Sequence, residues 1–203
     1  MSKLIWKPST LLGPLPPALV SCGTMEKPNV LTVAWTGIVN TDPAMTYVSI
    51  RPARFSYGLI EKSGEFAINL PTAALARACD FCGVRSGARV DKFREMRLTP
   101  EAGANISAPL IAESPLSLEC RVRQKLPLGS HTMFLADILS VDVDEKLLDR
   151  DGKLCLERAG LLAFAHGAYY ALGRELGTFG FSVRKKRTRP GVNSARHGKR
   201  GQA

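Results

Sequence analysis

Hydroxyl and guanidinium groups gather at residues 49–56, where a β-rich run ends. Residues 47–50 form the end of this run, and Pro52 stops it. The polar side chains around the stop are Ser49, Arg51, Arg54 and Ser56. Arg presents a planar fork of donors, and Ser hydroxyls and freed backbone N–H groups add more, so this strand end suits a phosphate. The alternative is an ordinary strand-to-helix turn whose arginines are solvated.

Cys79 and Cys82 form a C-x-x-C pattern. A redox pair and half of a zinc site both use this spacing. A zinc site needs a second pair, whereas Cys120 and Cys155 stand alone. A thioredoxin-like role needs a βαβ unit, which the sequence does not indicate. Positions three apart share one face of a helix, so two thiols packed in a core are the simpler interpretation.

Composition bounds the number of domains and the class of partner. The 203 residues, 45% of them apolar, fit one domain with a sizeable core. The net charge of +10 is concentrated at residues 184–203, which hold eight basic and no acidic residues. The rest of the chain has 20 basic and 18 acidic residues, a net charge of +2. We therefore predict one domain over residues 1–183 and a basic, disordered extension over residues 184–203. A near-neutral domain argues against nucleic acid as the partner.

Three features favour the cytoplasm and argue against a membrane. The five cysteines are an odd number scattered along the chain, which does not fit a disulfide framework. The sequence has no run of 18 apolar residues, so no transmembrane helix is expected. Prolines at positions 14, 16 and 17 interrupt the early apolar stretch, which makes it a poor signal-peptide core.

The elements that would position these side chains are mostly short strands. Thirteen prolines and eighteen glycines punctuate the chain, which favours short strands over long helices. In chain order, we predict strands at residues 17–22, 30–39, 45–50, 65–70, 116–126 and 131–143. Residues 127–129 predict a hairpin between the last two strands.

Helices are few in this pattern. Apolar spacing predicts short helices at residues 54–62 and 72–82, the second with Thr72 as N-cap and Gly83 as stop. Residues 83–115 look irregular. Residues 160–170 are apolar, and their periodicity leaves open a buried strand or a short helix. Within them, His166, Tyr169 and Tyr170 either rim a pocket or belong to an ordinary packed segment.

Many short strands and few helices predict a mainly β fold built as an antiparallel barrel. A parallel sheet would need strands that alternate with helices throughout the chain. No Gly-x-Gly-x-x-Gly follows a strand and no Walker-type loop is present, so a Rossmann unit and a P-loop are excluded.

Several segments, taken in their order, resemble the flavin reductase-like family. They are residues 29–35, 47–57, 66–70, 82–87, 91–93, 129–137 and 179–183. The resemblance covers residues 10–185 and is greatest to the flavoredoxin group of that family. It implies an FMN-binding split antiparallel β-barrel of Greek-key type with a few short helices.

The resemblance also implies which residues contact FMN. The strand holding Thr32, Val33, Ala34 and Trp35 would line the flavin ring, and the strand end holding Ser49, Ile50, Arg51 and Ser56 would cover the ribityl chain and phosphate. Asn29, Lys92, His131 and Phe164 would complete the site. No catalytic residue and no metal ligand are implied, because the flavin carries out the chemistry.

Each implied role is chemically reasonable. Ser56 would donate to the cofactor, and Lys92 would place a positive charge near the phosphate or the pyrimidine edge, where it stabilises a reduced anionic flavin. His131 would donate to a ring oxygen, and Trp35 and Phe164 would form apolar walls. Relatives can have Thr where this chain has Ser56, which keeps the hydroxyl.

The residues themselves allow plainer interpretations. Trp35 in a β-branched strand and Phe164 in an apolar run would both suit a core. Lys92 beside Asp91 would suit an exposed ion pair. His131 at a strand start would suit the surface.

The resemblance leaves two functions open. One is a flavoredoxin-like carrier that takes electrons from a redox partner protein and passes them on through bound FMN. The other is an NAD(P)H:FMN oxidoreductase that supplies reduced flavin to a partner oxygenase. In both cases the resemblance implies a homodimer with the cofactor near the interface.

Overall fold

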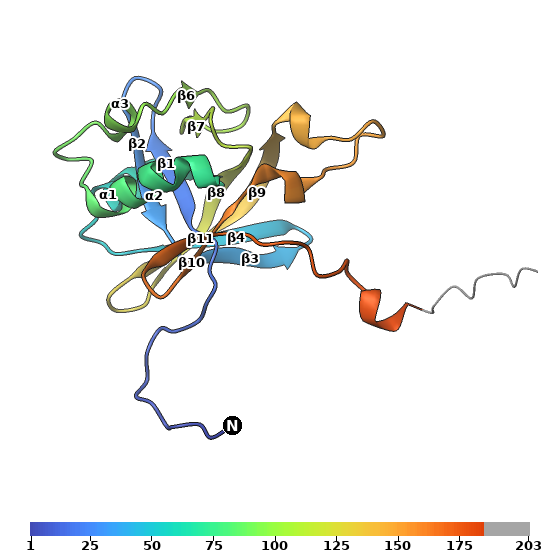
Figure 1. Ribbon diagram of the computed structural model, residues 1–203. Helices are drawn as coiled ribbons and strands as arrows, with labels where there is room; N and C mark the ends of the chain where they lie inside the picture. Colours follow the sequence, from blue (N-terminus) through green and yellow to red (C-terminus); the bar gives the residue numbers. More distant parts are fainter. Residues whose placement is uncertain (185–203) are drawn as a thin grey trace, which may run out of the picture. The chain divides into compact units, whose positions relative to one another are not determined.

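The computed structural model describes residues 1–184 of the chain, so all but the first residue of the predicted basic extension lies outside the described residues. The chain divides into two compact units, Met1–Leu172 and Gly173–Ala203. The first unit is mainly β and holds all the strands of the described residues (Figure 1). In the second, the described part contains one short 3-10 helix, η4 (Phe181–Val183).

A seven-stranded antiparallel sheet forms the body of the first unit. Its strand order is β2-β1-β5-β8-β9-β4-β3. The strands are β1 (Ala18–Gly23), β2 (Pro28–Val33), β3 (Thr36–Thr41), β4 (Ala44–Ile50), β5 (Glu65–Asn69), β8 (Leu116–Pro127) and β9 (Thr132–Val143). The predicted hairpin between β8 and β9 is present, and the Leu128 N–H closes it by donating to the carbonyl of His131 at 2.8 Å.

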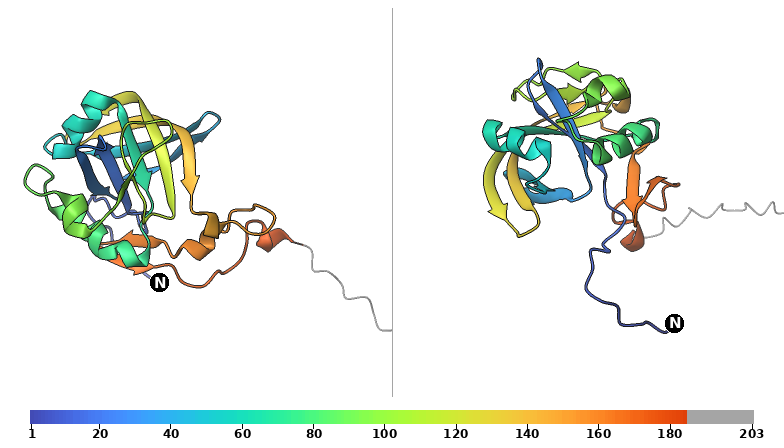
Figure 2. Two further views of the ribbon diagram at one scale, coloured as in Figure 1. Left: turned by 90° about the horizontal axis from the view of Figure 1, so that it is seen from above. Right: turned by 90° about the vertical axis from the view of Figure 1, so that its left-hand side faces the viewer.

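The sheet curls until its two ends meet. β2 and β3 are its outermost strands and are consecutive in sequence. Residues 34 and 35 join them, and the Ser49 N–H of β4 donates to the carbonyl of Trp35 at 2.9 Å. Figure 2 shows the strands curving round a common interior. That interior is a buried apolar core to which β1, β4, β5 and β9 contribute residues such as Val20, Val48, Phe66 and Phe134.

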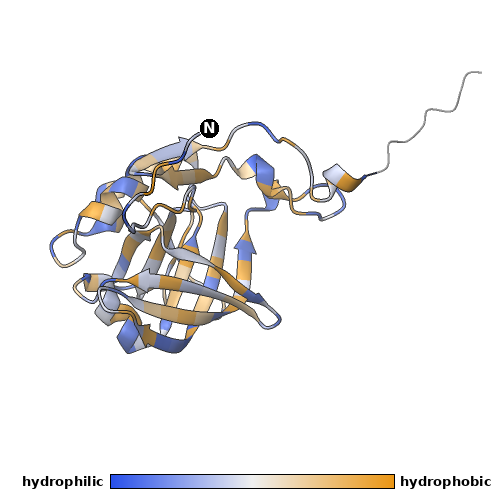
Figure 3. Ribbon diagram, turned by 90° about the horizontal axis from the view of Figure 1, so that it is seen from below, coloured by the Kyte–Doolittle hydropathy of each residue, from blue (hydrophilic) through white to orange (hydrophobic). Residues whose placement is uncertain are grey.

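Helices α1 (Phe55–Ser63), α2 (Ala76–Val84) and α3 (Lys92–Met96) pack against the part of the sheet that β1, β2 and β5 form, and the 3-10 turn η1 (Ala73–Leu75) leads into α2. The 3-10 turns η2 (Glu145–Leu147) and η3 (Leu156–Ala159) lie in the segment that follows β9. α2 and α3 pack on β1 and β2 through a second apolar cluster that contains Leu19, Val30, Cys79, Cys82 and Phe93. Figure 3 shows hydrophobic residues distributed along the strands of the sheet.

Four sequence predictions need correction. The strand predicted at residues 30–39 is two strands, because the chain turns at Ala34 and Trp35 to close the barrel. The helix predicted at residues 72–82 begins as η1, with no capping hydrogen bond from the Thr72 side chain, and continues as α2 beyond Gly83 to Val84.

The third and fourth corrections concern segments that looked irregular or ambiguous. Residues 83–115 contain α3 and the short strands β6 (Pro100–Glu101) and β7 (Leu110–Ile111). Residues 160–170 form neither one strand nor a helix but most of a hairpin, β10 (Leu162–Ala165) and β11 (Ala168–Ala171). Phe164 of β10 exchanges two 2.8 Å backbone hydrogen bonds with Leu15, which ties the hairpin to the N-terminal segment.

Among the described residues, no helix combines the length and the apolar character that a membrane crossing requires.

Candidate functional site

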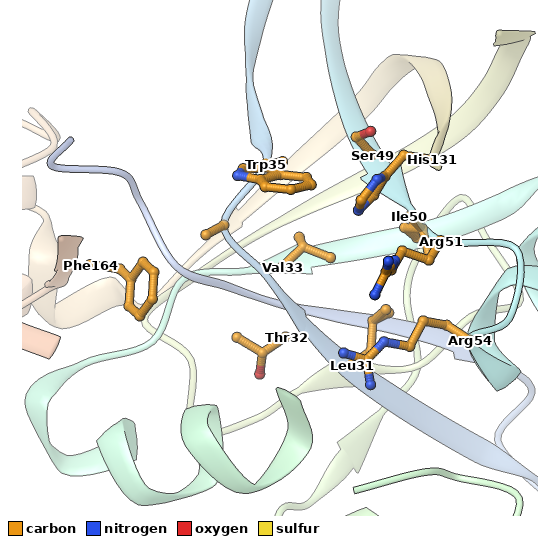
Figure 4. Close-up of a pocket in the computed structure, with 11 residues that line it drawn as sticks. Leu31, Thr32, Val33, Trp35, Ser49, Ile50, Arg51, Arg54, His131 and Phe164 are labelled. Carbon is orange, nitrogen blue, oxygen red and sulfur yellow. The ribbon is translucent and has the colours of Figure 1, made fainter. Parts of the chain in front are cut away.

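The ends of β2 and β4 and the start of β9 enclose a cavity of about 250 Å³, here called the aromatic cavity. Trp35 and His131 stand on one side of it and Phe164 on another, as Figure 4 shows. Its lining residues are Leu31, Thr32, Val33, Ala34, Trp35, Ser49, Ile50, Arg51, Arg54, His131 and Phe164. Nine of these are residues that the sequence resemblance placed around a flavin.

Three aromatic rings, those of Trp35, His131 and Phe164, stand in the wall of the aromatic cavity. The rings of Trp35 and His131 lie with their centroids 4.4 Å apart, tilted by 58°. Phe164 packs on Tyr169 with centroids 5.2 Å apart. The Trp35 side chain is 39% exposed, so the alternative interpretation of a core tryptophan is wrong. Exposed rings beside an apolar cavity suit a planar aromatic ligand.

A smaller cavity of about 90 Å³, here called the basic cavity, adjoins the first and shares Leu31, Thr32 and Arg54 with it. Its other lining residues are Ala53, Phe55, Ser56, Cys82, Gly83, Arg85, Ser86, Gly87 and Lys92. The full lining therefore combines two guanidinium groups, an ammonium group and three hydroxyls.

The N-terminus of α1 opens into this basic cavity. Arg54 is the N-cap, and no side chain caps the helix. The first turn of α1 holds no acidic residue. Exposed N–H groups at a helix N-terminus attract anions through hydrogen bonds and the helix dipole. The basic cavity is therefore built for an anionic group such as a phosphate.

Ser56 and Asn29 form a buried polar pair at the floor of the basic cavity. The Asn29 amide Nδ2 donates to Ser56 Oγ at 2.7 Å and to Cys22 Sγ at 3.3 Å. Both residues are at least 95% buried. Asn29 itself lines neither cavity, so the structure places it behind Ser56 rather than at the surface of the site.

Lys92 is buried, which rules out the exposed ion pair with Asp91. Its Nζ donates to the carbonyl oxygens of Val30 at 2.7 Å and Cys82 at 2.9 Å. Burial, together with the nearby positive charge of Arg54, holds the pKa of Lys92 below its ordinary value. Lys92 thus ties β2 to α2 and contributes positive charge from below the basic cavity.

His131 is half-buried at the opposite end of the site, against Trp35. Burial and then the charge of Arg51 lower the pKa of His131. Its Nδ1 lies 2.9 Å from the hydroxyl of Ser130. The neutral imidazole that this environment favours has one N–H to donate.

All five cysteines are free and buried. Burial raises the pKa of both Cys79 and Cys82 to about 11, which suppresses thiolate chemistry. Packing in the core, the simpler of the interpretations of the C-x-x-C pattern, is therefore confirmed. No cluster of metal-ligating side chains occurs within residues 1–184.

A third cavity of about 580 Å³ lies on the other side of the aromatic walls. It shares Trp35 and Phe164 with the aromatic cavity and is otherwise lined by residues 10–15 and 165–167. His166 belongs to this lining, whereas Tyr169 and Tyr170 do not line any of the three cavities.

The sequence prediction missed part of the basic cavity. Arg54 stood in the polar cluster of residues 49–56 but was not assigned to the site, and Arg85, Ser86 and Gly87 were not assigned at all. A Gly- and Ser-rich loop that carries an arginine is a signal for an anion site, but only the fold shows that this loop crosses the start of α1.

Comparison with known proteins identifies related chains. A family model described as flavin reductase like domain matches residues 13–173. An uncharacterized protein of Archaeoglobus fulgidus is 34% identical over 142 residues, which are 70% of this chain and 78% of that protein. The NADH-dependent FMN reductase AsuE2 of Streptomyces nodosus subsp. asukaensis is 32% identical over 123 residues, 60% of this chain and 64% of that protein.

A solved structure resembles the whole arrangement. Flavoredoxin of Desulfovibrio vulgaris (Miyazaki F) matches with a TM-score of 0.83 and 32% identity, over 90% of this chain and 100% of that one. The predicted mainly β split-barrel fold with a few short helices is therefore confirmed.

Proposed function

The chain belongs to the flavin reductase-like domain family, and from this membership we propose that it binds FMN and transfers electrons through it, as a flavoredoxin-like carrier. The observation that carries the proposal is the pairing of two adjoining cavities that differ in character and share Arg54. One has aromatic and apolar walls, and the other has a helix N-terminus and basic side chains. FMN has two matching ends, a flat ring system at one and a charged phosphate at the other.

The residues that line the two cavities can be assigned to the parts of FMN in order, from the ring system to the phosphate. Trp35, Val33 and Phe164 would hold the ring system. Ser49 and Arg51, at the end of β4, would face the ribityl chain. Arg54, Ser56 and the N-terminus of α1 would bind the phosphate through charge-assisted hydrogen bonds. Asn29 would hold Ser56 in place from behind.

The protein's own part in the chemistry is to bind, orient and set the charge around the ring. Bound FMN supplies the electron-transfer chemistry. The neutral His131 would donate a hydrogen bond to a ring oxygen, and the cationic groups Arg51, Arg54 and Lys92 would favour added negative charge on the ring. Packing of Trp35 and Phe164 against the ring faces would exclude water from them.

An absorption spectrum tests the proposal directly. The purified protein is expected to show flavin absorption bands, or to acquire them with added FMN at micromolar concentration, because both ends of the cofactor have a matching cavity. Fluorescence quenching of FMN on titration with protein measures the affinity. A protein that neither carries FMN nor quenches its fluorescence at these concentrations would refute the proposal.

A second function is the reduction of FMN by NADH or NADPH. It is favoured by the third cavity, which leaves space for a nicotinamide ring beside Trp35 and Phe164, and by the similarity to an NADH-dependent FMN reductase. Bleaching of bound FMN by NADH or NADPH, followed by many turnovers with added FMN, would assign this function. Slow FMN release without such turnover would assign the carrier, whose donor is then a redox partner protein.

We also propose that the chain works as a homodimer. Its N-terminal segment extends away from the sheet and exposes Leu4, Ile5, Trp6 and Leu12, each at 70% or more (Figure 1). Several large apolar side chains exposed on one short segment mark a protein–protein interaction site. We take this partner to be a second copy of the chain, because every molecule of the protein exposes the same segment.

Replacing Leu4, Ile5 and Trp6 by Ser is expected to convert the dimer into a monomer. Light scattering after gel filtration would give twice the chain mass of 22.0 kDa for the wild type and the single mass for the triple variant. The matched control replaces the exposed Leu128, Leu148 and Leu154 by Ser, which lie elsewhere and should leave the dimer intact. A wild-type monomer, or a triple variant that stays dimeric, would contradict this assignment.

Two further proposals concern the compartment of the protein and the part of the chain that binds FMN. Five free, buried cysteines favour a reducing compartment, and we assign the chain to the cytoplasm. We assign FMN binding to residues 1–183 and treat residues 184–203 as an extension that the cofactor site does not need.

A further inference from the structure

We infer that Gly87 is a positioning residue, which by its lack of a side chain sets the amide of Asn29 and thereby the hydroxyl of Ser56 in the basic cavity. The inference rests on the proposed function, because the hydroxyl is placed for the phosphate of FMN. It concerns a loop position that makes no hydrogen bond of its own to Asn29 in the described structure.

Space at Gly87 is the first observation. An ideal Cβ on Gly87 would lie 1.9 Å from Oδ1 of Asn29 and 3.0 Å from Cδ1 of Phe55. The first separation is shorter than real Cβ contacts and the second is tighter than nearly all of them, so no side chain fits without movement of Asn29 or of the loop. The φ angle of Gly87 is not in the left-handed region, so packing and not backbone conformation requires glycine here.

The hydrogen bonds of Asn29 are the second observation. Its Oδ1 faces Gly87, while its Nδ2 donates to Ser56 Oγ at 2.7 Å and to Cys22 Sγ at 3.3 Å. The residue is only 5% exposed, so its amide cannot simply turn out into water. A methyl group at position 87 would turn the amide, and a turned amide no longer reaches Ser56.

The position of Ser56 is the third observation. It lies in the first turn of α1, is 2% exposed, and lines the basic cavity together with Gly87. The contacts therefore run without a break from the loop through Asn29 to the hydroxyl that would meet the phosphate. The effect of Gly87 is specific to the phosphate end, because none of these residues lines the aromatic cavity.

Gly87→Ala is expected to weaken FMN binding about 10-fold, the loss that one hydrogen bond to a charged group would give. Riboflavin, which has the same ring system and no phosphate, should bind the variant and the wild type equally well within about twofold. The matched control is Gly58→Ala on the exposed side of α1, where an added Cβ meets no atom within 4 Å. This control should leave both affinities unchanged.

A double-mutant cycle isolates the contact with Asn29. Asn29→Ala removes Oδ1, so most of the loss caused by Gly87→Ala should disappear in that background, where only the contact with Phe55 remains. Should Gly87→Ala alone not fold, thermal unfolding of the double variant replaces the binding measurement. A midpoint within about 3 °C of that of Asn29→Ala supports the contact.

The outcomes separate the inference from the function on which it rests. Unchanged FMN affinity in Gly87→Ala, equal losses for FMN and riboflavin, or a full additional loss in the double variant would each overturn the role of Gly87 while FMN binding by the wild type stands. A wild type that does not bind FMN overturns both.

Discussion

Arg54→Glu is expected to weaken FMN binding about 100-fold, which would be the largest loss from any single change at the site. Arg54 is the N-cap of α1 and lines both cavities, so its guanidinium group is placed to meet the phosphate beside the helix N-terminus. The replacement removes a charge-assisted hydrogen bond and sets a carboxylate against a phosphate that carries up to two negative charges.

Isothermal titration with FMN at two salt concentrations checks this result. Because Arg54 is exposed, the loss should shrink at high ionic strength, where charges in water are screened. The matched control is Arg77→Glu, an exposed arginine of α2 that lines neither the aromatic nor the basic cavity. If Arg54→Glu binds FMN as tightly as the control does, the phosphate does not lie in the basic cavity.

Glu119→Ala is expected to lower the free energy of unfolding by about 3 kcal/mol and the thermal midpoint by about 10 °C. Glu119 is a fully buried carboxylate of β8. Its oxygens accept hydrogen bonds from the backbone N–H groups of Ala104 at 2.8 Å and Asn105 at 2.6 Å. Removing the carboxylate would leave these partly buried donors without an acceptor and release the loop before β7.

The same carboxylate predicts a pH dependence of stability. Burial alone would raise the pKa of Glu119, but hydrogen bonds from residues 104–106 and Ser140 outweigh it, and the pKa lies below the ordinary value. The stabilisation is thus fully present above the ordinary carboxyl pKa and is lost as the pH falls through the lowered folded value. Glu119→Gln should flatten the acid side of the stability curve.

Asp142 acts in the opposite direction. Burial and the neighbouring Glu119 charge raise the pKa of Asp142, so its contribution is present at low pH and is lost as the pH rises through the raised folded value. Urea unfolding from pH 3 to pH 8 separates the two groups, with the exposed Glu157→Gln as control. Equal acid sensitivity of Glu119→Gln and the wild type would contradict the assignment to Glu119.

Much of the fold could be predicted because a strand can be recognised from the pattern of its own residues. β-branched runs bounded by Pro and Gly mark β1, β4, β5, β8 and β9 to within one or two residues. The break between β2 and β3 could not be predicted, because Ala34 and Trp35 carry no turn signal. Their bend comes from the distant Ser49 N–H, which holds the Trp35 carbonyl. α3 was missed because five residues are too few to show a helical period, although Asp91 caps it.

The amino-acid sequence by itself determined the antiparallel barrel, the hydroxyl and guanidinium cluster at the end of β4 and, through the order of its segments, the family. These features depend on short-range patterns, each of which is contained within one short stretch of the chain. Only the tertiary structure decided that Lys92 is buried beneath the basic cavity, that Asn29 stands behind Ser56, and that Asn29 and Phe55 leave no room for a side chain at Gly87. Such contacts join residues from 27 to 62 positions apart, and packing brings them together without leaving any local trace in the sequence.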